Sequence, residues 1–317
     1  MSTKEERVKK VREITMNAVR LSHMAMHGGR VVIAPEILWH YTNADALEAI
    51  LETKKIYSTQ FKHLNDTSEI KLFSHIAIEI ASQKVKELPK IDDTVSVKTP
   101  EQFKTTLWHI INGVAENLVC DATYIACFSE IGDLLGQWRE YADNCKGYAV
   151  GLSTEWLKDQ SANEASFRLL KVIYHPNQQR AFISRFLDLT IDGFSIILSE
   201  AGESDQDDTL DLMIAFLKKL FAELSPIVKH PGYADEREWR LYSFGNHMEE
   251  HSYNDRLRRF EKINLNDAKR GHPFREIKIG PGNNIKNQES ELGLILDEIG
   301  LKNDIKISRS IIPVRPA

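Results

Sequence analysis

The sequence predicts an α+β fold in which helical insertions interrupt a mixed or antiparallel central sheet of short strands. About eight short runs have the apolar and β-branched composition of strands. Longer segments with helical periodicity lie among them, but the two kinds do not alternate regularly as in a parallel βαβ fold. We therefore expect one α+β domain over residues 36–317, preceded by a helical extension over residues 1–35.

The predicted elements follow from local patterns. Residues 4–26 have apolar side chains broadly on one side of a helix, which Gly28 and Gly29 would end. The stretch EILWHYTNADALEAILETKKIYSTQF, residues 36–61, predicts a strand, a helix and a second strand. Helical insertions are expected near residues 68–120 and 178–225, and a further helix near 288–299. The other predicted strands lie in ATYIACFSE, GYAVGLS, FRLLKVIYH, REWRLYSF, REIKIGP and DIKISRSI.

Composition narrows the functional class. The chain has 317 residues, 42% hydrophobic content and a net charge of −5, which does not suit a general nucleic-acid binder. The three cysteines, Cys120, Cys127 and Cys145, form no CxxC pair, so we expect a reduced cytoplasmic protein with neither a disulfide framework nor a metal site. No apolar run is long enough for a signal peptide or a membrane span, so a membrane partner is not expected.

The first candidate site lies at the end of the first strand. His40, Tyr41 and Thr42 follow an apolar run and come just before a predicted helix. If this strand end faces a cleft, three polar groups beside a helix N-terminus offer a surface for a ligand. The alternative is that His40 is a structural strand histidine.

The second candidate site is the stretch EREWR. Glu236 and Glu238 are two residues apart at the start of a predicted strand and would share one face. Two like charges on one face repel each other unless a ligand or a basic group pairs with them. The alternative is a solvated strand edge with a salt bridge to Arg240.

The third candidate site joins a strand end to a short helix. Ser129 ends a strand, and Trp138 and Tyr141 lie three residues apart on one helix face. Such an aromatic pair either belongs to the core or forms the wall of a pocket for a planar ring. The flanking strand patterns predict four buried residues, Ala126, Phe128, Ala149 and Val150.

Several motifs in this order resemble a bacterial domain-of-unknown-function family, number 2971. They are HYT with an ALxxIL helix, ND…E in LNDTSE, CFS…WxxYA…G, ExEWR and a C-terminal IxxSxIP. The resemblance covers nearly the whole chain after about residue 36. Two departures are LNDT, where the family has Phe-Asn-Asp-Pro, and the N-terminal helix, which lies outside the resemblance.

That family is in turn more distantly similar to ADP-ribosyltransferases. Those enzymes place His or Arg at the end of the first strand, a Ser, Thr or Tyr on the second, and a Glu on a late strand, often as Glu-x-Glu. The resemblance implies that His40 takes the first position, Ser58 or Thr59 the second and Glu238 the third, with Glu236 as the preceding acid. It also implies that NAD is the substrate and that these residues converge on one cleft.

The implied chemistry is cleavage of the nicotinamide–ribose bond through an oxocarbenium-like transition state. Glu238 would stabilise the developing positive charge, and His40 would hold a ribose hydroxyl. Tyr41 would stack on nicotinamide, and Glu236 would orient or deprotonate the acceptor. The expected NAD-binding surface is completed by Thr42, Ser129, Trp138, Tyr141 and Arg240.

The expected function is therefore that of an NAD-using, ADP-ribosyltransferase-like enzyme. It would act as a toxin or defence effector that modifies an unknown macromolecular acceptor, or it would hydrolyse NAD. The alternative from another class is a non-catalytic nucleotide-sensing or protein-interaction module with the same cleft. A nucleic-acid-processing protein is a third possibility, which the acidic balance disfavours.

Overall fold

The structure is a computed structural model that describes residues 3–26, 34–61, 68–88, 99–118, 123–163, 167–243, 249–253, 256–282 and 285–314. The chain divides into two compact units, each assembled from three separate segments. The helical unit comprises residues 1–32, 65–121 and 173–231, and the sheet unit comprises residues 33–64, 122–172 and 232–317.

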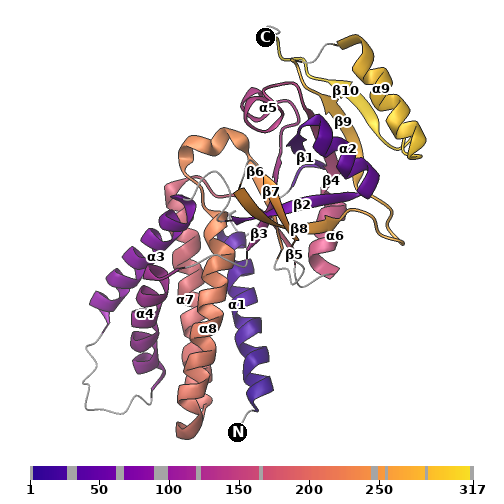
Figure 1. The fold of residues 1–317 in the computed structure, drawn as a ribbon. Coiled ribbons are helices and arrows are strands. Elements are labelled where there is room, and N and C mark those ends of the chain that lie inside the picture. The colour runs from indigo at the N-terminus through magenta and orange to yellow at the C-terminus, as the bar shows by residue number, and fades with distance from the viewer. Residues whose placement is uncertain are drawn as a thin grey trace. The chain divides into compact units, whose positions relative to one another are not determined.

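The helical unit brings together the N-terminal helix and both predicted helical insertions. In Figure 1, α7 runs beside α1 and α8, and it contacts α1, α3, α4 and α8. The N-terminal helix, predicted as an extension, thus packs along α7 as part of this unit. The helices are α1 (Lys4–Met26), α3 (Ser68–Glu87), α4 (Pro100–Glu116), α7 (Pro176–Glu200) and α8 (Gln206–Leu224), with short 3₁₀ turns η2 (Glu203–Asp205) and η3 (Ser225–Ile227).

Apolar stripes and a glycine contact hold the helical unit together. The rings of Phe186 and Phe221 meet at 6.4 Å between centroids, and both side chains are fully buried. A Cβ atom on Gly193 of α7 would lie 2.5 Å from Ile14 of α1, so only glycine allows the two helices to approach this closely. Burial of the apolar stripe of each helix supplies most of the stability of such a bundle.

In the part of the chain that the structure describes, the sheet unit contains the strands and four helices. The strands are β1 (Ile37–Thr42), β2 (Lys55–Gln60), β3 (Tyr124–Ser129), β4 (Tyr148–Ser153), β5 (Phe167–Lys171), β6 (Glu238–Ser243), β7 (Glu249–Tyr253), β8 (Arg256–Asn264), β9 (Phe274–Ile279) and β10 (Lys306–Arg309). The helices are α2 (Ala44–Thr53), α5 (Leu135–Tyr141), α6 (Thr154–Asn163) and α9 (Ile285–Glu298), and the 3₁₀ turn η4 (Pro231–Glu236) precedes β6.

The strands form one mixed sheet. Its main path runs β10-β9-β4-β1-β3-β2-β8-β7, and β6 pairs with both β3 and β5. The β9–β10 pair is parallel, and the other strand pairs are antiparallel. The prediction of an α+β fold with a mixed sheet is therefore confirmed. The β7–β8 hairpin and α6 were not predicted.

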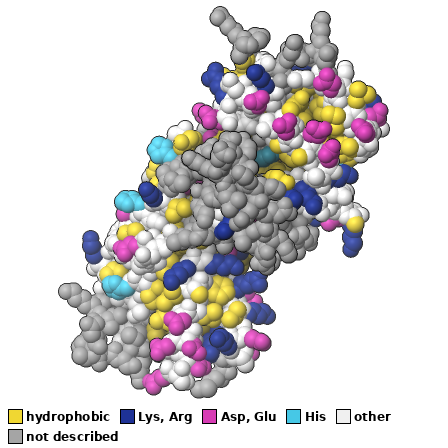
Figure 2. All heavy atoms as spheres, viewed as in Figure 1, with side chains coloured by type: hydrophobic (Ala, Val, Ile, Leu, Met, Phe, Trp, Pro, Cys, Tyr) yellow, Lys and Arg dark blue, Asp and Glu magenta, His cyan; other side chains and the backbone are white. Residues whose placement is uncertain are grey.

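Strands β3 and β4 are buried on both faces of the sheet. Ala126, Phe128, Ala149 and Val150 are all buried, as their strand patterns predict. No helix in the described ranges is long and apolar enough to cross a membrane. Among the described residues coloured in Figure 2, acidic and basic side chains are interspersed.

Candidate functional site

Strand β3 is the junction of the sheet, because three strands meet it. β6 pairs along its whole length, whereas β1 and β2 share its other edge. Trp39 of β1 lies opposite Ser129 at one end of β3, and Thr59 of β2 lies opposite Ile125 near the other end. The sheet therefore splits between β1 and β2, beside Cys127.

His40 lies at this split. Its Nδ1 lies 3.0 Å from the Cys127 carbonyl oxygen, and because a carbonyl only accepts, Nδ1 carries the proton. Burial lowers the pKa of His40, and the hydrogen bond to Cys127 only partly opposes this effect. His40 is therefore a neutral imidazole with its proton on Nδ1, and this proton is donated to the Cys127 carbonyl oxygen at the split between β1 and β2.

Strand register sorts the predicted site residues onto two faces of the sheet. Residues directly opposite each other on neighbouring strands share a face. One row reads Lys306, Glu276, Gly151, Trp39, Ser129 and Glu238 across β10, β9, β4, β1, β3 and β6. We call the side of the sheet that carries this row the Trp39 face; Tyr41 and Arg240 belong to it because each lies two residues along its strand from a member of the row.

His40, Thr42 and Ser58 lie on the opposite face. The ring of His40 is 5.9 Å from that of Phe128, whose neighbour Ser129 is on the Trp39 face. The face of Ser58 can be deduced in the same way. Ser58 is two residues from Gln60 on β2, and Gln60 lies opposite Tyr124, which is four residues before Phe128 on β3 and therefore on the same face as Phe128. The predicted convergence of His40, Ser58 and Glu238 on one cleft is therefore not found. The reason is the two-residue period of the strands, which also prevents three consecutive residues such as HYT from lining one surface.

Ser58 and Thr42 are core residues. Ser58 has no exposed surface, and its hydroxyl donates to the Glu261 carbonyl oxygen at 3.1 Å. Thr42 is also buried, at the end of β1. Neither side chain is open to a ligand in this conformation.

Glu238 forms a buried ion pair with Arg240. Nε of Arg240 donates to Oε1 at 2.8 Å, and Nη2 donates to Oε2 at 3.0 Å. The two residues are 5% and 2% exposed, so this bidentate pair is removed from water. The predicted salt bridge to Arg240 is present, but as a buried pair and not at a solvated strand edge.

Glu236 is not on the strand with Glu238. It ends the 3₁₀ turn η4, and Arg237 then adopts a left-handed conformation with φ 46° before β6 begins. The backbone carbonyl of Glu236 accepts a hydrogen bond from the Ser129 hydroxyl at 2.7 Å. The prediction that Glu236 and Glu238 share a strand face is wrong because this kink precedes the strand.

The aromatic pair on α5 is divided between core and surface. Trp138 is fully buried and meets Tyr41 edge-on at 4.8 Å, whereas Tyr141 is 41% exposed. The Tyr41 hydroxyl donates to the Ile131 carbonyl at 2.8 Å and accepts from the Leu134 amide at 3.1 Å. Burial, with a contribution from the nearby Asp133 carboxylate and against the Leu134 hydrogen bond, raises the pKa of Tyr41.

A half-buried polar network on the Trp39 face was not predicted. Ser308 donates to Glu276 at 2.5 Å and accepts from Lys278 at 2.8 Å, while Lys306 lies 3.2 Å from Glu276. Burial opposes ionisation of Glu276, but the hydrogen bonds from Ser308 and the two lysines lower its pKa overall. The Lys278 ammonium lies 5.6 Å from the centroid of the Trp39 ring. The sequence signal was the alternation of charged and apolar residues in REIKI.

The LNDTSE motif is described only in part. Asn65 and Asp66 lie outside the described residues. Glu69 is buried at the start of α3, with Lys229 at 3.9 Å. Within the part of the chain that the structure describes, no group of three or more His, Cys, Asp or Glu side chains is arranged to hold a metal ion.

Taken together, the Trp39 face carries a carboxylate paired with a guanidinium, a serine at a strand end, and aromatic rings. Glu238, Ser129 and Tyr41 are buried, and Trp39 is half-buried. Residues 137–241, which run from α5 to β6, match the model of a protein family of unknown function, DUF2971. The resemblance to this family is confirmed over residues 137–241. The DUF2971 match includes Trp138, Glu238 and Arg240 but not β1 or β10. No curated protein and no solved structure matched the chain.

Proposed function

We propose that the chain is an ADP-ribosyltransferase-like protein that binds NAD on the Trp39 face of the sheet and cleaves its nicotinamide–ribose bond. The observation that carries this proposal is the shared face of Glu238, Ser129, Trp39 and Tyr41 across three neighbouring strands. A carboxylate beside aromatic rings suits a ligand that combines a positively charged nicotinamide ring with ribose hydroxyls.

The proposed chemistry gives Glu238 and its ion-pair partner Arg240 different roles. Positive charge develops on the ribose as the bond to nicotinamide breaks, and an ionised carboxylate stabilises that charge. Glu238 is the carboxylate on the proposed face, and Arg240 favours its ionised form. Water then yields ADP-ribose and a proton, or an acceptor nucleophile takes the ADP-ribosyl group. His40 keeps a structural role at the split, which replaces its predicted contact with ribose.

Calorimetric titration with NAD tests the choice of face. Trp39 is half-buried on the proposed face, and His40 is its neighbour on the opposite one. We expect Trp39→Leu to weaken NAD binding roughly tenfold or more, since stacking on a nucleotide ring contributes about 1–3 kcal/mol. His40→Asn, the matched control, retains a donor for the Cys127 carbonyl and should bind NAD like the wild type. Weaker binding only in His40→Asn would assign the ligand to the other face, and no binding by the wild type would refute the proposal.

A second candidate is a nucleotide-sensing module that binds without turnover. One observation favours it: both carboxylate oxygens of Glu238 are hydrogen-bonded to Arg240, and the pair is buried. A carboxylate whose charge is already balanced stabilises a developing cation less well than a free one. NAD binding without release of nicotinamide would support this candidate over the enzyme.

A further inference from the structure

Asp133 links two segments that are far apart in the sequence. It lies between β3 and α5, and its Oδ1 accepts hydrogen bonds from Trp138 Nε1 at 2.8 Å and from the Ser310 hydroxyl at 2.5 Å. Its Oδ2 accepts a third bond from the Ile311 amide at 2.9 Å. A single carboxylate thus fastens the segment that follows β10 to α5, and hydrogen bonds to an ionised group are stronger than neutral ones.

The fastened segment, Ser310–Val314, covers part of the Trp39 face. Ile312 and Val314 pack on a buried cluster that includes Tyr41, Trp138 and Ala149. The cluster residues Tyr41 and Ala149 lie opposite each other on β1 and β4. Ile311, the residue before Ile312, points outward and is 91% exposed. The segment therefore lies over the aromatic part of the proposed site.

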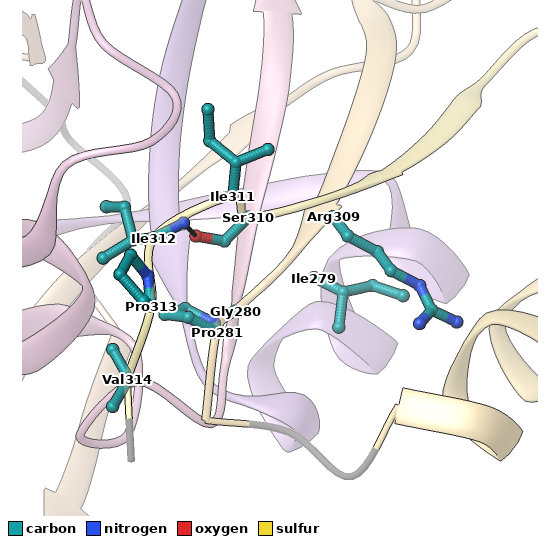
Figure 3. A pocket seen from close by; sticks show the side chains of 9 residues that line it. All are labelled: Ile279, Gly280, Pro281, Arg309, Ser310, Ile311, Ile312, Pro313 and Val314. Carbon is teal, nitrogen blue, oxygen red and sulfur yellow. Dashed lines mark hydrogen bonds between the residues drawn. The ribbon is translucent and has the colours of Figure 1, made fainter. Parts of the chain in front are cut away.

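Few interactions besides Asp133 hold this segment. The Ser310 amide donates to the Ile279 carbonyl at 2.9 Å, and the Ile312 amide donates to the Ser310 hydroxyl within the segment at 3.2 Å (Figure 3). Within the described residues, the remaining hydrogen bonds from the segment to other elements all go to Asp133.

A hollow that is open to solvent lies beside the segment. It has a volume of about 230 Å³ and is lined by Ile279, Gly280 and Pro281 on one side and by the segment on the other (Figure 3). Because protein atoms do not pack against this side of the segment, lifting it breaks fewer packing contacts than lifting a fully packed segment. The small number of hydrogen bonds and the hollow beside the segment both indicate that Ser310–Val314 is weakly held except at Asp133.

We infer that Ser310–Val314 is a strap, closed by Asp133, that opens to uncover the Tyr41–Trp138 cluster. Opening breaks the two bonds from Ser310 and Ile311 to Asp133 and the bond from the Ser310 amide to the Ile279 carbonyl, while the bond from Trp138 keeps the carboxylate in place. The consequence for ligand binding rests on the proposed function: if NAD binds the Trp39 face beside this cluster, a closed strap reduces the apparent affinity by the fraction of open molecules. The opening itself does not depend on NAD.

Amide hydrogen exchange on the full chain tests the strap. In Asp133→Asn, the carboxylate becomes a neutral amide of the same size, and we expect the Ile311 and Ile312 amides to exchange about 10- to 100-fold faster than in the wild type. Ser310→Ala removes one latch bond without touching α5, but it also removes the acceptor of the Ile312 amide, so the Ile311 amide is the reporter in this variant and should show a smaller acceleration. Asp143→Asn is the matched control, because the side chain of Asp143 is exposed and, among the described residues, forms no hydrogen bond with the strap.

Protection of β4 shows whether each variant is folded. If Asp133→Asn unfolds, β4 amides lose protection as well, and Ser310→Ala alone decides the outcome. Unchanged exchange of the strap in Ser310→Ala, or acceleration of the strap to the same extent in Asp143→Asn, would overturn the inference.

A titration with NAD separates the strap from the proposed function. Ser310→Ala should bind NAD more tightly than the wild type. The apparent affinity should increase by the same factor as the fraction of molecules with an open strap. Faster exchange without any NAD binding would leave the strap standing and refute the proposed function. NAD binding with unchanged exchange of the strap amides would support the proposed function and refute the strap.

Discussion

Replacing Glu238 by glutamine tests how much the buried ion pair with Arg240 stabilises the sheet unit. Glutamine keeps the size and one oxygen acceptor but removes the charge that faces the Arg240 guanidinium. The pair is at most 5% exposed and has two hydrogen bonds of 2.8 and 3.0 Å, so solvent screens it little. Removing one partner of a buried pair costs about 3–5 kcal/mol, whereas a surface pair is worth about 0–1 kcal/mol.

Thermal denaturation measures the effect of Glu238→Gln. At about 2–4 °C per kcal/mol for a unit of this size, the sheet unit should melt roughly 6–20 °C lower. Amide protection in β3 and β6 should fall with it, because Glu238 lies opposite Ser129 in that ladder. Glu52→Gln, an exposed position on α2, is the control and should melt like the wild type. If Glu238→Gln melts within about 1 °C of the wild type with β6 still protected, the pair is not structural and the argument from burial is wrong.

Three further predictions concern the same unit. Trp138→Ala should cost about 3–5 kcal/mol in urea denaturation because its ring is fully buried, whereas Tyr141→Ala on the exposed side of the same helix should cost less than about 1 kcal/mol; equal effects would contradict the placement of α5. Gly147→Ala should destabilise by roughly 1–3 kcal/mol, since the added Cβ would lie 2.1 Å from the Thr42 carbonyl oxygen; wild-type stability in urea would show that this close approach is absent. The lowered pKa of His40 means that the unfolded chain binds its proton more readily, so stability contributed by His40 is complete above about pH 6.5 and falls as the pH drops below that value. His40→Asn should lose less stability than the wild type between about pH 7.5 and 5, and parallel melting curves would refute the assignment.

The local fold was readable from the sequence because most elements have a clear period. The apolar strands and the long amphipathic helices were predicted close to their observed positions. The hairpin of β7 and β8 was missed because EEHSY and RLRRFEKIN are dominated by charged residues and lack a continuous apolar face. The gathering of α1 with both helical insertions is a tertiary arrangement, which no local pattern encodes.

The sequence pattern could place only some of the predicted site residues on a common face. Tyr41, Ser129, Glu238 and Arg240 do share one face, with Trp138 packed against Tyr41. The alternation of strand side chains already separates His40 from Tyr41, and applying it strictly would have divided the HYT motif between two faces.

Other features of the site depend on three-dimensional contacts. The left-handed kink at Arg237 removes Glu236 from the strand, although arginine has no special preference for that conformation. Asp133 and Ser310 are 177 positions apart in the sequence and meet only after folding. Neither feature has a local signature that sequence reasoning could have used.

Release of nicotinamide from NAD tests the central claim most directly. The purified chain is incubated with NAD, and nicotinamide and ADP-ribose are separated by chromatography, with heat-denatured protein as the blank. The account predicts nicotinamide release by the wild type, and a lower rate in Trp39→Leu but not in His40→Asn. If the native chain releases no more nicotinamide than the blank and shows no heat of NAD binding, the assignment of an NAD-using function to this fold is contradicted.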